Sequence, residues 1–426
     1  MSKGKSIKSI AILFFTVFSV LKINAQAVNN ANSTLDGSTL NTITTSMPFM
    51  SITPDSRSGA MGDVGTALSA TSSSIFWNTA MLNFAEKKSE ISVSYTPWLR
   101  QLTNDIHLSY VSAYTKLGSK SAITGALRYF SLGSITFTDA TGSVIRDDKP
   151  SEFEITAGYA FKLSSKMSFG LNGKFANSNL TGGLPVAGAS TKAGIAGAAD
   201  ISFIYYNDQF KLGSTKGNFS LGATINNIGN KVNYSDALSR DFLPMNLKIG
   251  TAYEMEIDNY NNFTFALDLS KLLVPTPAVY DASGAILSGK SDEVGVIAAM
   301  LQSFGDAPGN LVKDKNGDVE LDAEGNATVV KNSILKEELR EVMIATGIEY
   351  WYNKTLAIRS GFFYENKLKG ARQYFNAGIG LKYNIIGIDI SYLIALKRNN
   401  PLANTMRFTL RFDIGSKSTD KPVTTE

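Results

Sequence analysis

Apolar and polar side chains alternate along most of this chain from about residue 90 onward. Between residues 151 and 163, for example, Phe153, Ile155 and Tyr159 alternate with Glu154 and Thr156. A period of two is typical of β-strands that present one apolar and one polar face. After residue 25, no apolar run reaches the about 18 residues that a membrane-spanning helix requires. The pattern therefore predicts an all-β protein.

The alternating segments are long enough to cross a bilayer as strands. Most contain about nine or more residues, the length of a tilted membrane strand, whereas strands of globular proteins average about five or six. We predict fourteen strands, at residues 90–98, 105–117, 120–137, 151–163, 167–180, 194–207, 217–228, 245–257, 261–272, 342–352, 356–364, 373–385, 388–395 and 403–414.

The connections between these strands alternate in length. Joins after even strands are short, as at 118–119 and 353–354, whereas joins after odd strands are longer, above all 273–341. Outer-membrane barrels have short periplasmic turns and long extracellular loops. A soluble β-sandwich or β-helix, the alternative for an alternating pattern, does not predict this sidedness. We therefore predict a 14-stranded antiparallel transmembrane outer-membrane β-barrel.

The predicted barrel occupies residues 90–415, with one long extracellular loop at 273–341. Residues 26–89 precede the barrel as a separate segment, and residues 416–426 follow it as a flexible periplasmic tail. Because an even number of strands returns the chain to the side where it began, we expect both termini in the periplasm. Within the loop, the amphipathic run 334–340 predicts a short helix, with residues 337–340 on a solvated face.

The first 25 residues have the order of regions found in a cleavable signal peptide. Three lysines precede an apolar stretch of about a dozen residues, and the small residue Ala25 follows it. The leader's four lysines account for the formal charge of +4, so the remaining chain is electrically balanced. That balance removes the argument for nucleic-acid binding, which depends on a basic surface. The chain contains no cysteine, so an exported form would have no disulfides.

The segment 26–89 becomes rich in glycine and other small residues around positions 58–65. Such a segment can form a compact hatch or plug in the barrel lumen, because glycine lets the backbone approach the wall closely. Trp77 can fill lumen volume while its indole N–H finds a partner. The alternative is a folding element that only seals the pore. The candidate hatch residues are Arg57, Gly59, Met61, Gly62, Trp77 and Asn78.

Residues 55–67, together with 74–80, resemble the N-terminal signature of the PorV family, the outer-membrane barrels of the type IX protein secretion system. That family is related to the FadL long-chain fatty-acid transporters. Its pattern reads Arg-x-x-Gly-Met-Gly, then small residues, then aromatic-Asn-Pro-Ala. Here Ala60 separates Gly59 from Met61, and Thr79 stands where proline is usual. The resemblance implies a FadL-like barrel with an N-terminal hatch, in the outer membrane of a Gram-negative bacterium.

The resemblance also implies a function in protein export. Such a barrel lies among outer-membrane lipid and lipopolysaccharide and associates with the SprA translocon. It receives cargo proteins through their C-terminal secretion domains and passes them to the cell-surface attachment complex with its sortase PorU. The alternative is a FadL-like transporter of hydrophobic solutes. A third possibility, an enzyme such as a lipopolysaccharide deacylase, lacks a catalytic constellation in this sequence.

The residues that could carry catalysis or bind a metal are few. His107 is the only histidine, and its phase opposite Ile106, Leu108 and Tyr110 predicts that it points to the lumen or lies in a girdle. Residues 314–318, with Asp322 and Glu324, could bind Ca²⁺ through alternate oxygens or could form a hairpin around Asn-Gly. The ligand spacing departs from that of an EF-hand, so we expect no metal and no cofactor.

The long loop supplies the candidate partner-binding residues. Apolar side chains exposed on an extracellular surface are unfavourable unless a partner covers them. The alternative is that these residues fold back and cap the barrel rim. The candidates are Leu272, Leu273, Val274, Val279 and Tyr280.

Overall fold

The computed structural model describes residues 40–99, 103, 105–139, 141–183, 190–213, 215–235, 240–281, 283–315, 319–323, 326–396 and 403–417. The predicted signal peptide, residues 26–39 of the predicted hatch and most of the predicted tail lie outside these residues. None of the helices in the described part of the chain is long and apolar enough to cross a membrane.

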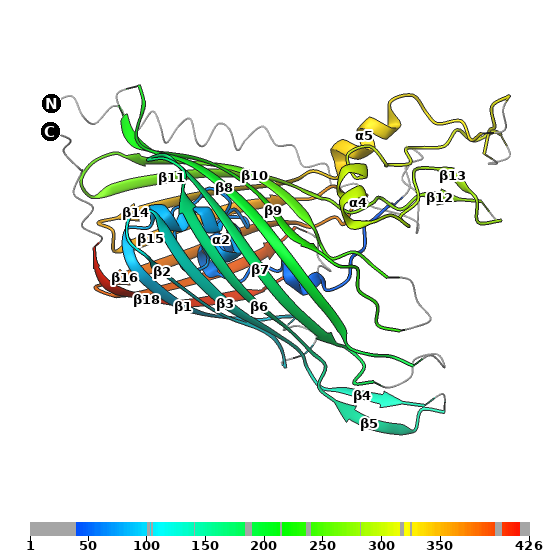
Figure 1. Ribbon diagram of the computed structural model, residues 1–426, viewed down its shortest axis with the longest axis horizontal. Helices are drawn as coiled ribbons and strands as arrows, with labels where there is room; N and C mark the ends of the chain where they lie inside the picture. Colours follow the sequence, from blue (N-terminus) through cyan, green and yellow to red (C-terminus); the bar gives the residue numbers. More distant parts are fainter. Residues whose placement is uncertain are drawn as a thin grey trace. The chain divides into compact units, whose positions relative to one another are not determined.

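Fourteen antiparallel strands close into a barrel, in which β1 pairs with β18 along the seam (Figure 1). The strand number and the antiparallel order agree with the prediction. The barrel strands are β1 (Lys87–Pro97), β2 (Ile106–Lys116), β3 (Ser121–Leu132), β6 (Ser151–Lys162), β7 (Met167–Asn179), β8 (Gly194–Leu212), β9 (Thr215–Gly229), β10 (Asn246–Glu256), β11 (Asn261–Leu272), β14 (Met343–Tyr352), β15 (Leu356–Tyr364), β16 (Gln373–Tyr383), β17 (Ile386–Ala395) and β18 (Met406–Lys417).

The alternation in the sequence separates the two faces of the barrel wall. On β6, the apolar residues Ile155 and Tyr159 are exposed on the outside, whereas Glu152, Glu154 and Thr156 are buried inside. A lipid-facing surface requires apolar side chains, and a filled polar lumen accepts charged ones. The pattern therefore gives each strand the side-chain orientation of a membrane barrel.

The connections alternate in length around the barrel, as predicted. Short turns such as 163–166, 257–260 and 384–385 lie at one end, which we call the short-turn end, and β18 also ends there. The opposite end, the long-loop end, carries 230–245 and 273–342 among its connections.

Two predicted strands are clearly wrong in extent: β8 runs to Leu212, five residues beyond the predicted end, and the strand predicted at 120–137 ends early. We expected a continuous strand over 120–137, but β3 ends at Leu132 and Gly133 turns the chain with φ +80°. A side chain at Gly133 would meet the carboxylate of Asp105, so the turn requires glycine. The strands β4 (Ile135–Thr138) and β5 (Val144–Asp148) form a separate two-stranded sheet outside the barrel.

The prediction that His107 points to the lumen is also wrong. Its neighbours Leu108 and Tyr110 are buried on the inner face, and the imidazole lies outside between the rings of Tyr95 and Tyr129. The apolar inner residues have partners within the lumen, because Leu108 belongs to a cluster with Phe49 and others. His107 therefore lies in a girdle of aromatic rings, the other position considered for it.

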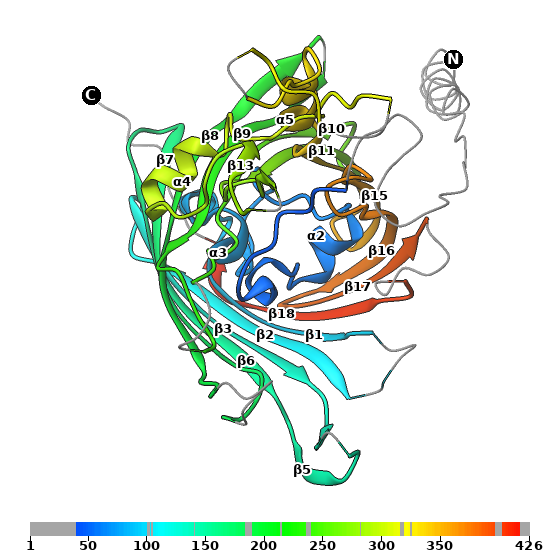
Figure 2. The same cartoon turned by 90° about the vertical axis from the view of Figure 1, so that its right-hand side faces the viewer.

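The N-terminal segment runs through the barrel interior (Figure 2). At the long-loop end, the Asn41 amide donates to the Leu368 carbonyl oxygen, 3.0 Å away. At the short-turn end, Lys116 Nζ donates to the Ala85 carbonyl oxygen, 3.2 Å away, just before β1 begins. Between these points lie η1 (Pro48–Ser51), α2 (Ser56–Ala60), α3 (Ser74–Trp77) and η2 (Thr79–Phe84).

The long loop has secondary structure of its own. It contains the two-stranded sheet of β12 (Val279–Tyr280) and β13 (Ile286–Ser288), and the helices α4 (Val296–Gln302) and α5 (Ser333–Arg340). These elements lie at the long-loop end, near β8–β11 (Figure 1).

Candidate functional site

Asp55, at the start of α2, also holds α3 in place. Asp55 caps α2, because its Oδ2 accepts a hydrogen bond from the Ser58 amide at 2.9 Å. Its Oδ1 accepts from Trp77 Nε1 at 2.7 Å. One buried carboxylate thus joins α2 to α3, and the two halves of the predicted signature form a single folded unit.

Arg57 connects this unit to the barrel wall. Its Nε and Nη2 donate to the two carboxylate oxygens of Glu349 on β14, at 3.0 and 2.7 Å. Its terminal nitrogens also donate to the carbonyl and hydroxyl oxygens of Ser69, within the interior segment. A bidentate pairing of this kind fixes both distance and orientation. Arg57 therefore holds α2 in one position against the wall.

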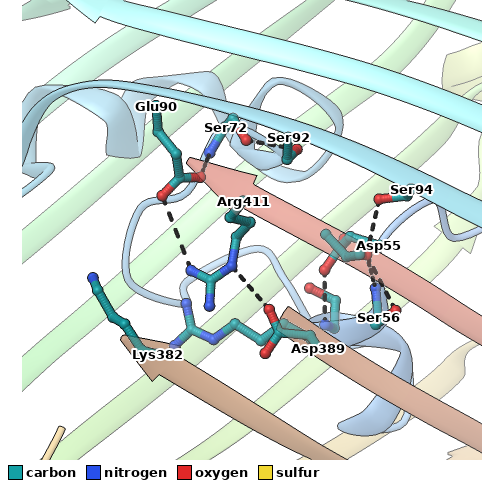
Figure 3. Close-up of polar contacts among 12 residues, drawn as sticks. Asp55, Ser56, Ser72, Glu90, Ser92, Ser94, Lys382, Asp389 and Arg411 are labelled. Carbon is teal, nitrogen blue, oxygen red and sulfur yellow. Dashed lines mark hydrogen bonds and ion pairs between the residues drawn. The ribbon is translucent and has the colours of Figure 1, made fainter. Parts of the chain in front are cut away.

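The pairing continues from strand to strand as a buried ladder of charges. Arg359 on β15 donates to Glu349 at 2.5 Å and to Asp389 on β17 at 2.6 Å. Arg411 on β18 donates to Asp389 at 2.8 Å, and its Nη1 lies 4.0 Å from Glu90 on β1 (Figure 3). Glu90 in turn accepts from the Ser72 amide of the interior segment at 2.7 Å. The ladder begins and ends on that segment and crosses the barrel seam.

Glycines on two neighbouring strands let the backbone of the interior segment touch the wall. A Cβ on Gly347 or on Gly361 would overlap the backbone of Met61, and Gly62 is held at φ +74° in the same place. Only glycine tolerates both the close approach and the left-handed conformation. Gly59 lies against the side chain of Arg407, which is flexible and leaves more room.

The part of the segment around Trp77 and Asn78 binds different strands, β10 and β8. The Lys248 ammonium lies 4.5 Å from the centre of the Trp77 ring. Asn78 Nδ2 donates to the Thr66 and Phe203 carbonyl oxygens, at 2.8 and 3.0 Å. All six residues proposed from the signature thus lie in the interior segment, and each approaches or contacts the barrel wall.

The residues proposed for partner binding are divided by the structure. Leu273 and Val274 are each 2% exposed and belong to a core with Phe242, Met245 and Ala299. They fold back onto the rim, which is the alternative considered for them, and are not accessible in this conformation. Leu272 lines a cavity inside the barrel, Val279 is half-buried, and Tyr280 remains exposed.

The acidic residues of α5, which were expected to be solvated, instead join the long loop to the barrel through ion pairs. Glu337 on α5 and Glu341 just beyond it are buried, and Lys369 Nζ lies 2.6 Å from the first and 2.9 Å from the second. Lys271 contacts Glu341 and lies 3.1 Å from Glu338. The prediction failed because Lys271 on β11 and Lys369 in the connection after β15 are distant in the sequence, and the helical pattern of residues 334–340 does not reveal them.

The possible Ca²⁺ segment lies partly outside the described residues. Its flanks are bridged, Lys313 to Val319 and Leu321 to Ala327, as paired strands would be. Among the residues that the structure describes, no group of three or more His, Asp or Glu side chains could hold a metal ion.

A family model described as "Type IX secretion system protein PorV" matches residues 36–279, more than half of the chain. This chain belongs to the PorV family. It is therefore an outer-membrane component of type IX secretion, as the resemblance of residues 55–80 implied. The family description names a secretion component and no catalytic activity. A search of curated proteins found no match.

Solved structures with a similar fold are FadL-like outer-membrane proteins. The Pseudomonas putida toluene transporter TodX is 13% identical with a TM-score of 0.45, over 83% of this chain and 95% of TodX. A FadL homologue from Pseudomonas aeruginosa is 10% identical with a TM-score of 0.43, over 85% and 99%. The Ralstonia pickettii toluene transporter TbuX is 10% identical with a TM-score of 0.44, over 84% and 97%.

One carboxylate makes the loop of this PorV family member sensitive to pH. Burial, together with the nearby Glu338 and Glu341, raises the pKa of Asp306 to about 6, although the Thr276 amide donates a hydrogen bond to it. An undocked loop would titrate near the ordinary value of 3.8. The docked loop therefore gains a proton as pH falls through about 6, and docking strengthens between pH 7.5 and pH 5.

We expect Asp306→Asn to tighten loop docking at pH 7.5 and to flatten its pH dependence. A difference of about two pKa units corresponds to at most about 3 kcal/mol. Hydrogen exchange of residues 305–309 at pH 5.5 and 7.5 measures the effect, and Asp292→Asn, an exposed carboxylate in the same loop, is the control. Faster exchange of the wild type at pH 5.5 than at pH 7.5, after correction for intrinsic rates, would contradict this assignment.

Proposed function

We propose that this chain is a closed docking barrel of type IX secretion. It associates with a SprA-type translocon, receives cargo through the cargo's C-terminal domain, and passes it to a PorU-type attachment complex. The observation that carries the proposal is the family match, supported by an interior segment locked to the wall from Arg57 to Ser72. The interior segment fills the lumen and would act as a plug. A plugged barrel suits a protein that holds partners at its rim better than it suits an open conduit.

Deleting the gene tests this proposal. We expect cargo proteins to remain unprocessed, in the periplasm or bound to the translocon, while uptake of fatty acids stays near normal. Immunoblots of cell fractions and of the medium measure cargo, and labelled oleate measures uptake. A complementing plasmid is the control. Normal secretion in the deletion strain would refute the proposed function.

A second candidate is a transporter of hydrophobic solutes, and one observation favours it. A cavity of about 580 Å³ lies between the interior segment and the wall near the long-loop end, and apolar residues such as Phe49, Trp98 and Phe130 line it together with charged residues, among them Glu152, Arg372 and Arg407. The same deletion strain separates the two functions. Normal secretion together with lost uptake of a hydrophobic nutrient would support the transporter.

The orientation of the barrel follows from its loops, and we propose that the long-loop end is extracellular. β18 then ends on the periplasmic side, as we expected for the C-terminus. The N-terminal segment, however, meets the barrel at Asn41, which hydrogen-bonds to the long connections at Leu368 and Pro277. We therefore propose that the chain around Asn41 lies on the outside, in place of the periplasmic start expected from the strand count.

Cysteine labelling tests this orientation, since the chain has no native cysteine. With an impermeant maleimide on intact cells, we expect Thr42→Cys and Lys315→Cys to be labelled and Leu117→Cys, in a short turn, to be protected. All three side chains replaced are exposed. Labelling of Leu117→Cys alone would show that the barrel has the opposite orientation in the membrane. Labelling of Lys315→Cys without Thr42→Cys would place the N-terminal entry elsewhere.

A further inference from the structure

Outward-facing aromatic rings form a band near the long-loop end on nine barrel strands. Neighbouring rings of the band contact one another, as Phe153 does Phe175, with centroids 6.1 Å apart, and Phe362 does Phe375, at 4.7 Å. Such girdles hold a barrel at the boundary between lipid and water. The band consists of Tyr95, His107, Tyr129, Phe153, Phe175, Phe362, Phe375, Tyr392 and Phe408.

The band is interrupted over the remaining five strands, β8, β9, β10, β11 and β14. Among the described residues, the outer face of these strands near the long-loop end carries no aromatic ring. Apart from Lys271 on β11, which pairs with Glu338 and Glu341 of the loop, the residues there are aliphatic or small, such as Ile195, Ala199, Ile225, Leu247 and Ile344. These five strands are neighbours in the barrel, so the gap is one continuous sector. This sector lacks the side chains that position the rest of the barrel in lipid.

Helix α4 lies over the rim of the same sector (Figures 1 and 2). Its buried face, with Ala299 at 0% exposure, packs into the loop core together with Val296 and Met300. The same core covers Ile225 and Leu247, which point outward from β9 and β10. The helix is therefore fixed to the outer edge of the barrel, and its position is set by side-chain packing.

The opposite face of α4 is apolar and uncovered. Ile297 and Leu301, four residues apart on one side of the helix, are 63% and 73% exposed, and Phe304, two residues beyond the helix end, is 55% exposed. A contiguous apolar stripe on a surface that faces water is the usual mark of an interaction site. The core beneath α4 includes Ile225 of β9 and Leu247 of β10, so the stripe lies at the rim of the gap.

The charges around α4 favour a protein over a lipid surface as its partner. Helices that lie in a lipid interface carry Lys or Arg on their polar face, whereas α4 has no charged residue at all. The exposed Asp292 and Glu293 precede it beside Lys290, and Lys231 Nζ donates to the Asp292 carbonyl oxygen at 3.1 Å, so the approach to α4 carries no excess of positive charge that would attract anionic lipid headgroups. A protein surface can present apolar side chains to the stripe and a basic group to this acidic pair.

We propose that α4 and the aromatic gap over β8–β14 form the docking face for a neighbouring integral outer-membrane protein. The partner contributes an apolar surface at the level of the outer rim, with a basic side chain opposite Asp292 and Glu293. This inference rests on the proposed function, in which that neighbour is the translocon. It moves the partner-binding surface of the loop from Leu273 and Val274, which are buried, to α4.

Photo-crosslinking in cells tests the face with a matched control. A benzophenone amino acid replaces Leu301 in one strain and, in another, the outward-facing Val93 on β1, which lies opposite β10 in the strand order. We expect Leu301 to crosslink to the translocon subunit, identified by mass spectrometry, and Val93 not to do so. Crosslinks of Leu301 only to lipopolysaccharide, only to a second copy of this chain, or to nothing would overturn the proposal. Equal crosslinking from Val93 would do the same.

A double substitution separates the failure of this face from the failure of the proposed function. We expect Leu301→Ser with Phe304→Ser to lower co-purification with the translocon at least fivefold at unchanged barrel abundance, and Val93→Thr to leave it unchanged. Unchanged co-purification in the double variant would refute the face and leave the function standing. Absence of co-purification from the wild-type protein would refute the proposed association itself, and the face with it.

Discussion

Replacing Glu349 with Gln is expected to turn a poorly conducting barrel into a conducting one. Its carboxylate accepts hydrogen bonds from Arg57 and Arg359, and all three side chains are buried. Gln keeps the shape but removes the charge, so Arg57 loses its only ion-pair partner among the described residues. Removing one member of a buried ion pair typically costs about 3–5 kcal/mol. We expect this cost to release α2 from the wall and to open a path along β14–β18.

Single-channel recording in planar bilayers measures this effect. The wild type should conduct poorly, Glu349→Gln should show frequent or larger openings, and deletion of residues 40–85 should set the upper limit if the barrel still folds. Glu254→Gln is the matched control, because Glu254 faces the same lumen and bonds to Asn218 on the wall. If Glu349→Gln conducts no more than Glu254→Gln, the charge ladder does not hold the interior segment.

Gly361→Ala is expected to prevent the interior segment from seating at all. The added Cβ would overlap the backbone of Met61 and Gly62, which has no flexible end that could move aside. Overpacking of cores usually costs about 1–3 kcal/mol, and an overlap with backbone lies at or above the upper end of that range. Because Gly347 and Gly378 confine the same stretch from neighbouring strands, a sideways shift meets further overlaps.

Limited proteolysis of the folded barrel measures the seating. In detergent, we expect Gly361→Ala to be cut within residues 41–84 at least tenfold faster than the wild type, while heat-modifiable migration on gels shows that the barrel has formed. Gly173→Ala is the control, since a Cβ there meets no atom within 4 Å. Equal protection of the two variants would mean that the segment is not held at this contact.

The period of two was sufficient to predict the barrel, because lipid on one side and a polar lumen on the other impose opposite side-chain types on each strand. The same rule failed at His107. There the lumen contains Phe49 and Met50, so Leu108 and Tyr110 face inward although they are apolar. Polarity predicts orientation only where the lumen is polar, and an apolar patch on the interior segment inverts the orientation locally.

The candidate hatch residues could be named from the signature, but their partners on the wall could not. Glu349, Arg359, Asp389 and Arg411 come from four strands, and their pairing depends on the register between strands. The available signal was that each occupies an inward position of its strand. The predictions for the long loop failed for a similar reason. The burial of Leu273 and Glu337 depends on contacts with Phe242 and Lys369, which are far away in the sequence.

The path of the interior segment has a consequence for how the protein is assembled. From Asn41 to Ala85 the chain runs lengthwise through the barrel and continues directly into β1, whose partner at the seam is β18, the last strand to be synthesised. If the strands closed first, the segment would have to be drawn through a finished ring from one mouth to the other. Closure around a segment that is already folded avoids this step. It requires β1 to wait for the strand farthest from it in the chain, a contact of high sequence separation that forms slowly. During that delay the open sheet exposes two unpaired edges, β1 and the growing C-terminal edge. Insertion machinery that shields such edges must therefore protect β1 until β18 pairs with it.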